Sequence, residues 1–212
     1  TGFRAIIYSR PMVTVIPADD VDVIVPDLER EHANEKALAD KIHVYYETVY
    51  YEGKEISYLE HLDKVLSKLS KHAVIGVEYN AMPVELFKYL TSKFSNEIAD
   101  VGEKIKQMRF TKDEQEIKLL VEAGKLSDIA LAESMRHARA GISELEFDVL
   151  GDKKLLEEAA KNYKEDIVGF ANWTCSGPIR SAMPHLYSST RKFEDGDVVV
   201  HSRQVWLNGY RA

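Results

Sequence analysis

The sequence has little of several features that mark special classes of protein. Its one cysteine, Cys175, cannot form an intramolecular disulfide, which favours a reducing, cytoplasmic compartment. The 28 Lys and Arg against 35 Asp and Glu leave a net charge of −7, with no surplus of cations to bind nucleic acid or an anionic membrane. The longest apolar stretches, such as residues 74–77, are far shorter than the roughly 18 residues of a membrane span. We therefore expect no disulfide scaffold, no nucleic-acid partner and no membrane partner.

What remains is the composition of an ordinary globular protein. Of the 212 residues, 45% are hydrophobic and 30% are charged, which excludes disordered and collagen-like classes. This length predicts one or two domains, which bury roughly 70% of the unfolded surface. Thr1 opens one strand-like segment and Ala212 closes another. The sequence therefore predicts a fragment that lacks segments at both ends.

Residues 1–108 alternate between predicted strands and helices. Apolar runs predict strands at 3–8, 12–16, 21–25, 42–49, 74–77 and 97–101. Helical spacing predicts helices at 27–38, 57–69 and 83–94, with Asp27 as the N-cap of the first and Ser57, paired with Glu60 in a capping box, as that of the second. This order predicts an α/β domain with a mixed or parallel sheet and helices packed on it.

The composition changes near residues 108–110, where we expect a second domain, 109–212, to begin. Thr111 with Glu114 predicts the start of a long helix that runs to Ala140 and ends at Gly141. Ser143 with Glu146 predicts a second helix to about residue 161. Strands are predicted at 166–174 and 198–207, on either side of a loop rich in Ser, Gly and Pro.

That loop contains the candidate catalytic residue, His185. A histidine among small residues, on a loop carried by a rigid sheet, is a common general acid or base. A lone loop histidine is more often an ordinary surface residue, so the spacing alone leaves both interpretations open. Cys175 could act as a nucleophile with His185, although a small buried cysteine is the usual interpretation.

Other polar and aromatic clusters are expected to be structural. Four of the remaining histidines lack a repeated metal-ligand spacing, and His137, between Arg136 and Arg139, is expected on a solvated face of a helix. The tyrosine cluster could bind a ligand, although aromatic residues in strands are usually packed, and the lysines lie on the polar side of a helix. These residues are His32, His43, His61, His72 and His137, Tyr45, Tyr46, Tyr50 and Tyr51, and Lys64, Lys68 and Lys71.

Residues 109–212 also contain short motifs in a fixed order. They are R-F-T-K-D-E-Q-E-I at 109–117, A-G-I-S-E-L-E at 140–146, S-G to P-H at 176–185, and the pairs G-D at 196–197 and G-Y at 209–210. T-G-F at 1–3 and P-D-L-E at 26–29 precede them. Together they resemble the creatinase/prolidase/aminopeptidase P family. The resemblance implies a creatinase-type N-terminal α/β domain at 1–108 without its first strand and helix, then the first part of an α+β pita-bread catalytic domain at 109–212.

The same resemblance implies a chemistry. Family members are mostly metallopeptidases that cleave Xaa-Pro bonds, with two divalent cations held by carboxylates and a histidine, and they usually form homodimers. By resemblance we expect an Xaa-Pro dipeptidase- or aminopeptidase P-like hydrolase with a small peptide or small-molecule substrate and a divalent metal such as Mn, Co or Zn. His185 matches the histidine of the P-H motif, which shuttles a proton or stabilises the intermediate and does not bind metal.

One position departs from the family pattern. The first metal-ligand Asp should lie seven residues before Gly209, where this sequence has Ser202, and Gln204 stands where the family has Gly. His201 is one residue away, and its side chain would point to the opposite face of the strand. The remaining ligands would lie beyond Ala212.

Ser202 keeps three hypotheses open. The first is a peptidase-like hydrolase with a modified metal site. The second is a metal-independent, creatinase-like hydrolase of C–N bonds in which His185 is the general base toward water and no metal cofactor is bound. The third is a non-catalytic pita-bread protein that serves as a binding module.

Overall fold

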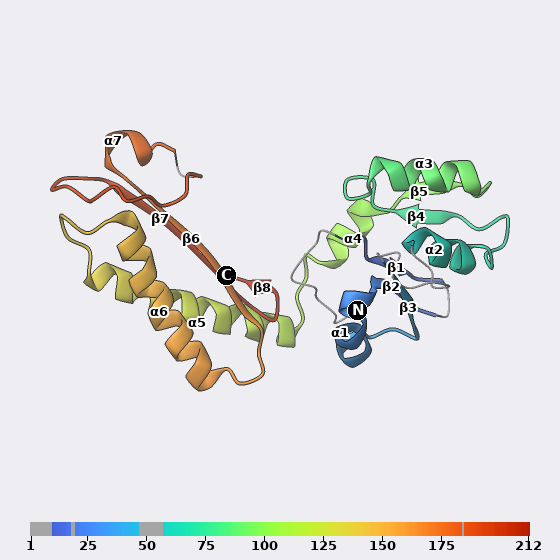
Figure 1. Cartoon of the computed structure of the whole chain (residues 1–212), viewed down its shortest axis with the longest axis horizontal. Helices are drawn as coiled ribbons and strands as arrows, with labels where there is room; N and C mark the ends of the chain where they lie inside the picture. The colour runs from blue at the N-terminus through green and yellow to red at the C-terminus, as the bar shows by residue number, and fades with distance from the viewer. Residues whose placement is uncertain (1–9, 18–19, 47–56, 184) are drawn as a thin grey trace. The chain divides into compact units, whose positions relative to one another are not determined.

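The computed structural model describes residues 10–17, 20–46, 57–183 and 185–212. The chain folds as two compact units, unit 1 at Thr1–Met108 and unit 2 at Arg109–Ala212 (Figure 1). The strand predicted at 3–8, the end of the strand predicted at 42–49, and Tyr50 and Tyr51 lie outside the described residues. Within the described ranges, every helix is too short or too polar to span a lipid bilayer.

Unit 1 contains a mixed sheet and a smaller parallel pair. Strand β1 (Val13–Val15) is antiparallel to β2 (Asp22–Pro26), which is parallel to β3 (Lys41–Tyr45). Strand β4 (Ile75–Val77) is parallel to β5 (Ile98–Asp100). The prediction of a mixed or parallel sheet is therefore confirmed.

The helices of unit 1 are short. After the 3-10 turn η1 (Asp27–Glu29) come α1 (Arg30–Lys36), α2 (Tyr58–Leu66), α3 (Val84–Lys93) and α4 (Gly102–Met108). Leu62 and Leu66 of α2 and Leu90 of α3 pack in one cluster with Ile24 and Tyr45 of the mixed sheet. This apolar cluster buries the strands predicted from their apolar runs.

Several predicted helix ends in unit 1 are wrong. Pro26, not Asp27, is the N-cap of η1, and the Asp27 carboxylate instead accepts a hydrogen bond from Arg30. Ser57 does cap α2, accepting from Leu59 N at 3.2 Å, but Glu60 does not complete the box. Leu38 lies beyond the end of α1 and is 77% exposed. Helix α4 was not predicted, because it buries no residue and so shows no apolar stripe.

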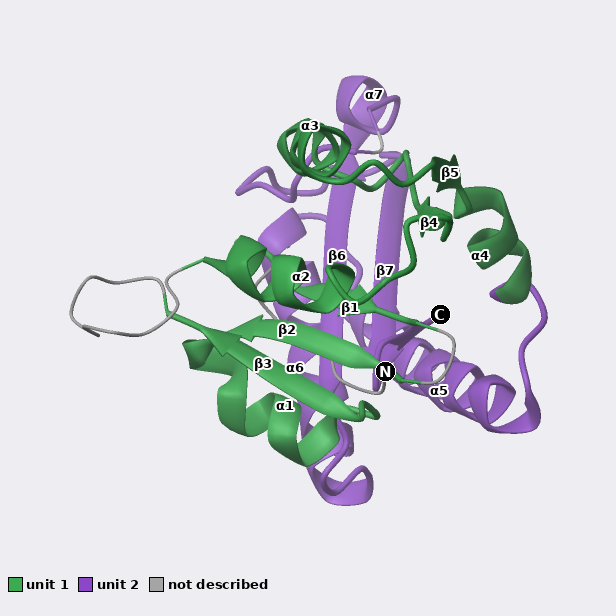
Figure 2. Cartoon of the chain, turned by 90° about the vertical axis from the view of Figure 1, so that its right-hand side faces the viewer, with its two compact units in different colours: residues 1–108 green, residues 109–212 purple. Residues whose placement is uncertain are grey.

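Unit 2 is a long β-hairpin with two helices along it (Figure 2). Its main elements are α5 (Glu114–Arg136), α6 (Glu144–Asn162), β6 (Val168–Ser176), α7 (Gly177–Arg180), β7 (Val199–Leu207) and β8 (Tyr210–Arg211). Strands β6 and β7 pair antiparallel from Val168–Leu207 to Ser176–Val199, and β8 pairs with β7. Leu126 of α5 and Leu155 of α6 pack with Val205 of β7, so both helices cover the same face.

The helix starts of unit 2 follow capping chemistry. Ser143 and Glu146 form the predicted capping box of α6. The capping box predicted for α5 is wrong by two residues, because Asp113 and Glu116 form the box in place of Thr111 and Glu114. The two pairs have the same spacing, and the carboxylate of Asp113 accepts from two backbone N–H groups. Helix α5 also ends earlier than predicted, at Arg136, with Gly141 in the following loop at φ 88°.

Candidate functional site

The two faces of the β6–β7 hairpin have different neighbours. Side chains alternate along a strand, and Thr174 of β6 donates to the Asp148 carboxylate of α6, so its face is the helix-covered one. Cys175, the next residue, points to the open face, where its Sγ donates to the carbonyls of Met183 (3.5 Å) and Leu186 (3.3 Å). The loop that contains His185 therefore lies on the open face.

Ser202 shares this open face. It pairs with Trp173 across the hairpin, and Cys175 pairs with Val200, two residues earlier on β7. His201 pairs with Thr174 and points to the helix-covered face, as the strand period predicts. The structure thus brings Ser202 and the His185 loop to the same face and puts His201 on the other.

The described residues do not form a metal centre. On the open face Ser202 and Gln204 offer a neutral hydroxyl and an amide, and divalent cations such as Mn²⁺ prefer carboxylates. Across the described ranges, no group of three or more His, Cys, Asp and Glu is placed to hold a metal ion. The donor set around Ser202 does not fit the group that the family implies.

His185 itself is exposed and forms no hydrogen bond or ion pair with another described residue. Cys175 is fully buried and its thiol is turned to the two loop carbonyls. This arrangement gives Cys175 the role of a packed thiol that attaches the loop to β6, and gives no support to a nucleophilic pair with His185.

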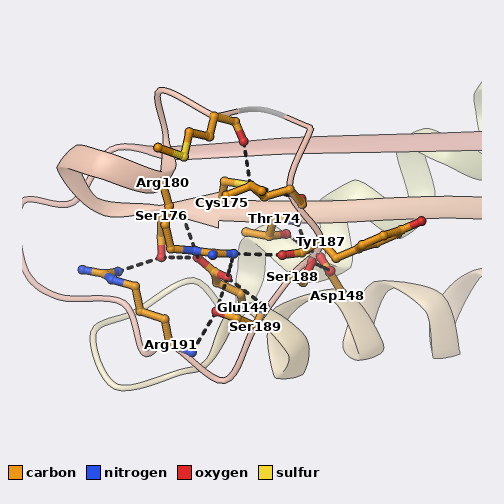
Figure 3. A network of polar contacts seen from close by, with 12 residues as sticks. Glu144, Asp148, Thr174, Cys175, Ser176, Arg180, Tyr187, Ser188, Ser189 and Arg191 are labelled. Atoms are coloured by element: carbon orange, nitrogen blue, oxygen red, sulfur yellow. Dashed lines mark hydrogen bonds and ion pairs between the residues drawn. The ribbon is translucent and has the colours of Figure 1, made fainter.

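A buried carboxylate, Glu144, lies beneath both ends of this loop (Figure 3). It is the first residue of α6 and has no exposed surface. Its Oε1 accepts from Ser176 N and Oγ, both at 2.8 Å, and from Arg180 Nε at 3.0 Å. Its Oε2 accepts from Arg180 Nη2 at 2.8 Å and from Ser189 N and Oγ at 2.8 and 2.7 Å.

These hydrogen bonds decide the protonation of Glu144. Burial alone disfavours the charged form, but the hydrogen bonds donated by Arg180, Ser189 and Ser176 outweigh it and lower the pKa of Glu144 to about 2. The same ion pair raises the pKa of Arg180. Glu144 is therefore an ionised, fully hydrogen-bonded carboxylate inside the fold.

A second carboxylate, Asp148, lies one helical turn further along α6. It accepts from Thr174 Oγ1 and from Ser188 Oγ. Because the Thr174 hydroxyl donates to Asp148, its oxygen is left to accept from Nδ1 of His201, at 2.8 Å. The ring of His201 also packs edge-on against Phe147, at 5.2 Å between centroids. His201 is thus part of a structural network on the helix-covered face.

A second ion pair, between Arg191 and Asp197, supports the start of the loop. Arg191 Nη1 donates to Asp197 Oδ2 at 2.6 Å and to Ser176 Oγ at 2.7 Å, and this hydrogen bond lowers the pKa of Asp197. Gly177 has φ 80°, and a Cβ there would lie 2.7 Å from Arg191 Nη2. Glycine is needed at 177 both for the backbone and for the guanidinium beside it.

The other residues singled out from the sequence have structural surroundings. Tyr45 is a core residue, the His61 ring lies 2.9 Å from the carbonyl of Val44, and the His43 ring lies 2.5 Å from Asp22. The prediction of a solvated face for His137 is wrong, because its side chain is half-buried and its Nε2 lies 3.1 Å from Glu133 Oε1. Lys64, Lys68 and Lys71 are exposed, as predicted.

Sequence reasoning missed Glu144 and Asp148. Acidic side chains are common in the first turns of helices, so these two residues do not stand out in the sequence. The available signal was their four-residue spacing, which puts both on one face of the helix, together with the serines that flank the loop. No rule of spacing says which distant segment such a face meets.

Known proteins share both halves of the chain. Residues 1–111 match the Creatinase/Prolidase N-terminal domain, and residues 118–212 match Metallopeptidase family M24. The chain is 27% identical over 165 residues to creatinase from a Bacillus species, covering 76% of this chain and 40% of that protein. It is 25% identical over 187 residues to Xaa-Pro dipeptidase from Pyrococcus horikoshii, covering 88% of this chain and 47% of that protein.

Solved structures agree with these matches. The X-Pro aminopeptidase of Thermotoga maritima superposes with a TM-score of 0.75 at 27% identity, covering 95% of this chain and 51% of that one. The prolidase of Thermococcus sibiricus, at 22% identity, shares the fold with a TM-score of 0.77, covering 100% of this chain and 55% of that one.

The chain spans about half the length of the relatives it matches. The Creatinase/Prolidase N-terminal domain alone accounts for more than half of the 212 residues. The motifs of the opening and of residues 109–212 are thereby explained together, and the chain belongs to the creatinase/prolidase family, with the mixed α/β architecture of its pita-bread members.

Proposed function

We propose that the protein is an Xaa-Pro peptidase-like hydrolase in which His185 shuttles a proton at a peptide bound on the open face of β6–β7. The observation that carries the proposal is the attachment of the His185 loop to the face that contains Ser202. Relatives named Xaa-Pro dipeptidase and X-Pro aminopeptidase support the substrate class.

The proposed role of His185 follows from its surroundings. Imidazole can both accept and donate a proton near neutral pH. The exposed ring can approach a substrate on the open face without first breaking a hydrogen bond within the described fold. In the proposed step, water adds to the carbonyl carbon of the scissile amide, the imidazole accepts the proton that the water loses, and the protonated ring returns this proton to the amide nitrogen as the C–N bond breaks. The described residues offer no set of metal ligands, so the step is assigned to the imidazole and to water.

The test uses the full-length protein that carries this sequence, assayed for hydrolysis of Xaa-Pro dipeptides with and without added Mn²⁺. We expect turnover, and a loss of about 10²–10⁴-fold in kcat for His185→Ala. His72→Ala, which removes an exposed histidine of unit 1, is the matched control and should change kcat less than about twofold. Absence of hydrolysis under both conditions, or unchanged turnover in His185→Ala, would overturn the proposal.

Ser202 favours a second candidate function. A serine in place of the first ligand supports a metal-independent hydrolase of C–N bonds, and the Bacillus creatinase is among the relatives. In that reaction His185 acts as general base toward water on a guanidino substrate. Hydrolysis of creatine that is unaffected by EDTA or Mn²⁺ would favour this candidate, and Mn²⁺-dependent cleavage of Xaa-Pro dipeptides the first. Failure of both reactions would favour the binding-module hypothesis.

We also propose the arrangement that the family implies for the whole protein. Residues 1–108 would be the N-terminal domain and 109–212 the first part of the catalytic domain, in a cytoplasmic homodimer. Light scattering of the full-length protein tests the assembly, since a monomer would contradict it.

A further inference from the structure

The segment that contains His185 is attached to unit 2 on both sides of the histidine. Ser176 lies at its start and Ser189 at its end, and Glu144 accepts two hydrogen bonds from each. We call residues 177–189 the histidine loop. One buried side chain thus closes the loop at both ends.

Arg180 adds a connection across the loop. Its guanidinium binds Glu144 through Nε and Nη2, and Nη2 also donates to the carbonyl of Tyr187 at 2.8 Å. Tyr187 is two residues after His185. The Glu144–Arg180 pair therefore fixes the backbone close to the histidine, not only at the ends of the loop (Figure 3).

A helix-stabilising role does not account for Glu144. An acidic first residue favours a helix through the macrodipole, but the capping of α6 is done by Ser143 and Glu146. All six hydrogen bonds that Glu144 accepts from described residues come from β6 and the histidine loop. Its side chain thus serves the loop more than its own helix.

We propose that Glu144 is a positioning residue that holds the histidine loop on the open face of β6–β7, so that His185 is presented in one orientation. The inference rests on the proposed function of His185, to which Glu144 contributes through the loop without touching substrate. Asp148 supports the same loop one turn away, through Ser188.

The substitution Glu144→Gln tests the inference with little change in volume. Each carboxylate oxygen accepts from three donors, two of them N–H groups. Whichever oxygen the amide NH₂ replaces, two N–H groups lose their acceptor, and the ion pair with Arg180 is lost. Glu146→Gln is the matched control. It also removes a carboxylate from the start of α6, but the Glu146 carboxylate accepts from Ser143 and not from the histidine loop.

The first readout is amide hydrogen exchange, which does not depend on activity. In Glu144→Gln we expect exchange in residues 177–189 to accelerate roughly tenfold or more, with α5 and the 168–172 part of β6 unchanged. In Glu146→Gln the histidine loop should keep its protection. Unchanged exchange of the loop in Glu144→Gln would overturn the inference, whether or not the protein hydrolyses any substrate. If Glu144→Gln does not fold, Ser189→Ala, which removes one of the six hydrogen bonds, is measured in the same way.

The second readout is turnover. If the wild type cleaves an Xaa-Pro dipeptide, Glu144→Gln should lower kcat by roughly tenfold or more, with KM changed less than about threefold. Adding Glu144→Gln to His185→Ala should then cost nothing further, because a residue that acts through another is not additive with it. Additive losses would overturn the positioning role, whereas an inactive wild type with an accelerated loop would overturn the proposed function alone.

Discussion

The two ends of the β6–β7 hairpin rest on the same pair of helices but are held in different ways. At one end Val168, Phe170 and Val205 pack against Leu126 and Leu155 in an apolar cluster. At the other end the same face of the hairpin presents hydrogen-bonding side chains to carboxylates of α6. These are Thr174, Ser176 and His201 against Glu144 and Asp148.

The apolar end stabilises the sheet, whereas the polar end fixes the geometry of the loop. Apolar contacts are non-directional and stabilise the hairpin wherever volume is filled. Buried hydrogen bonds have fixed directions, so a satisfied network specifies one geometry, at the expense of desolvating its members. Between the ends, buried Arg203 binds Asp152, which also accepts from Asn172. The interior becomes polar toward the end from which the histidine loop departs.

The largest expected loss of stability comes from a substitution at the apolar end. Leu155→Ala should lower the free energy of unfolding of unit 2 by about 2–5 kcal/mol, because it leaves a cavity under the hairpin. Both tryptophans, Trp173 and Trp206, lie in β6 and β7, so tryptophan fluorescence in a urea titration reports on this unit. Leu156→Ala, at an exposed neighbour, is the control and should cost under about 1 kcal/mol. Equal costs would contradict the assignment of the apolar end.

Acid should weaken the polar end next. The pKa of Glu144 is lowered from 4.5 to about 2, so its stabilising contribution is complete above pH 4.5 and is lost as the pH falls toward 2. The wild type should exceed Glu144→Gln in free energy of unfolding by up to about 3 kcal/mol at pH 7. This gap should narrow between about pH 4.5 and 2, measured by urea titrations at each pH. A gap that does not change with pH would show that the charge of Glu144 does not stabilise the fold.

Two isosteric exchanges compare the ends directly. Thr174→Val removes the hydroxyl that joins Asp148 to His201, and Val205→Thr puts a hydroxyl into the apolar cluster. Each should lower the free energy of unfolding by about 1–3 kcal/mol, since each leaves a buried polar group without its partner. Chemical denaturation followed by tryptophan fluorescence measures both. An increase in the free energy of unfolding in Thr174→Val would contradict the claim that buried hydrogen bonds hold the polar end.

The smallest expected effect concerns an exposed ion pair of α6. Lys153 lies 3.9 Å from Glu157, and both side chains are mostly exposed. Lys153→Ala should change the free energy of unfolding by about 0.5 kcal/mol or less, because water and salt screen such pairs. A larger change in the same denaturation assay would mean that exposed charges on this helix also stabilise the fold. That result would contradict the proposed difference between exposed Lys153 and buried Glu144.

The parts of the fold that could be predicted from the sequence are those specified by neighbouring residues. The box at Ser143 and Glu146 and the apolar strands are local patterns, and the structure confirms them. The start of α5 was misplaced because Thr111 and Asp113 head identical spacings, and the carboxylate of Asp113 is the group that caps. The exposed helix α4 carries no apolar stripe to find.

The site shows the same limit more clearly. A loop with His185 between two strands could be read from residue types alone. That Glu144 meets Ser176 and Ser189, 32 and 45 residues away, depends on how α6 packs against the hairpin. Long-range partners of a buried charge are set by tertiary packing, which residue spacing does not encode.

The double closure of the histidine loop also bears on how such a protein can diverge. Because Ser176 and Ser189 are fastened to one carboxylate, the chain between Arg180 and Tyr187 is a closed insert whose ends are fixed by the scaffold. Side chains at exposed positions such as Ala182 and Leu186 can be exchanged without moving these ends, because it is the backbone carbonyls of Met183 and Leu186 that accept from Cys175. Natural variation or laboratory libraries at such positions can therefore reshape what lies over the open face while Glu144 still holds both ends of the loop.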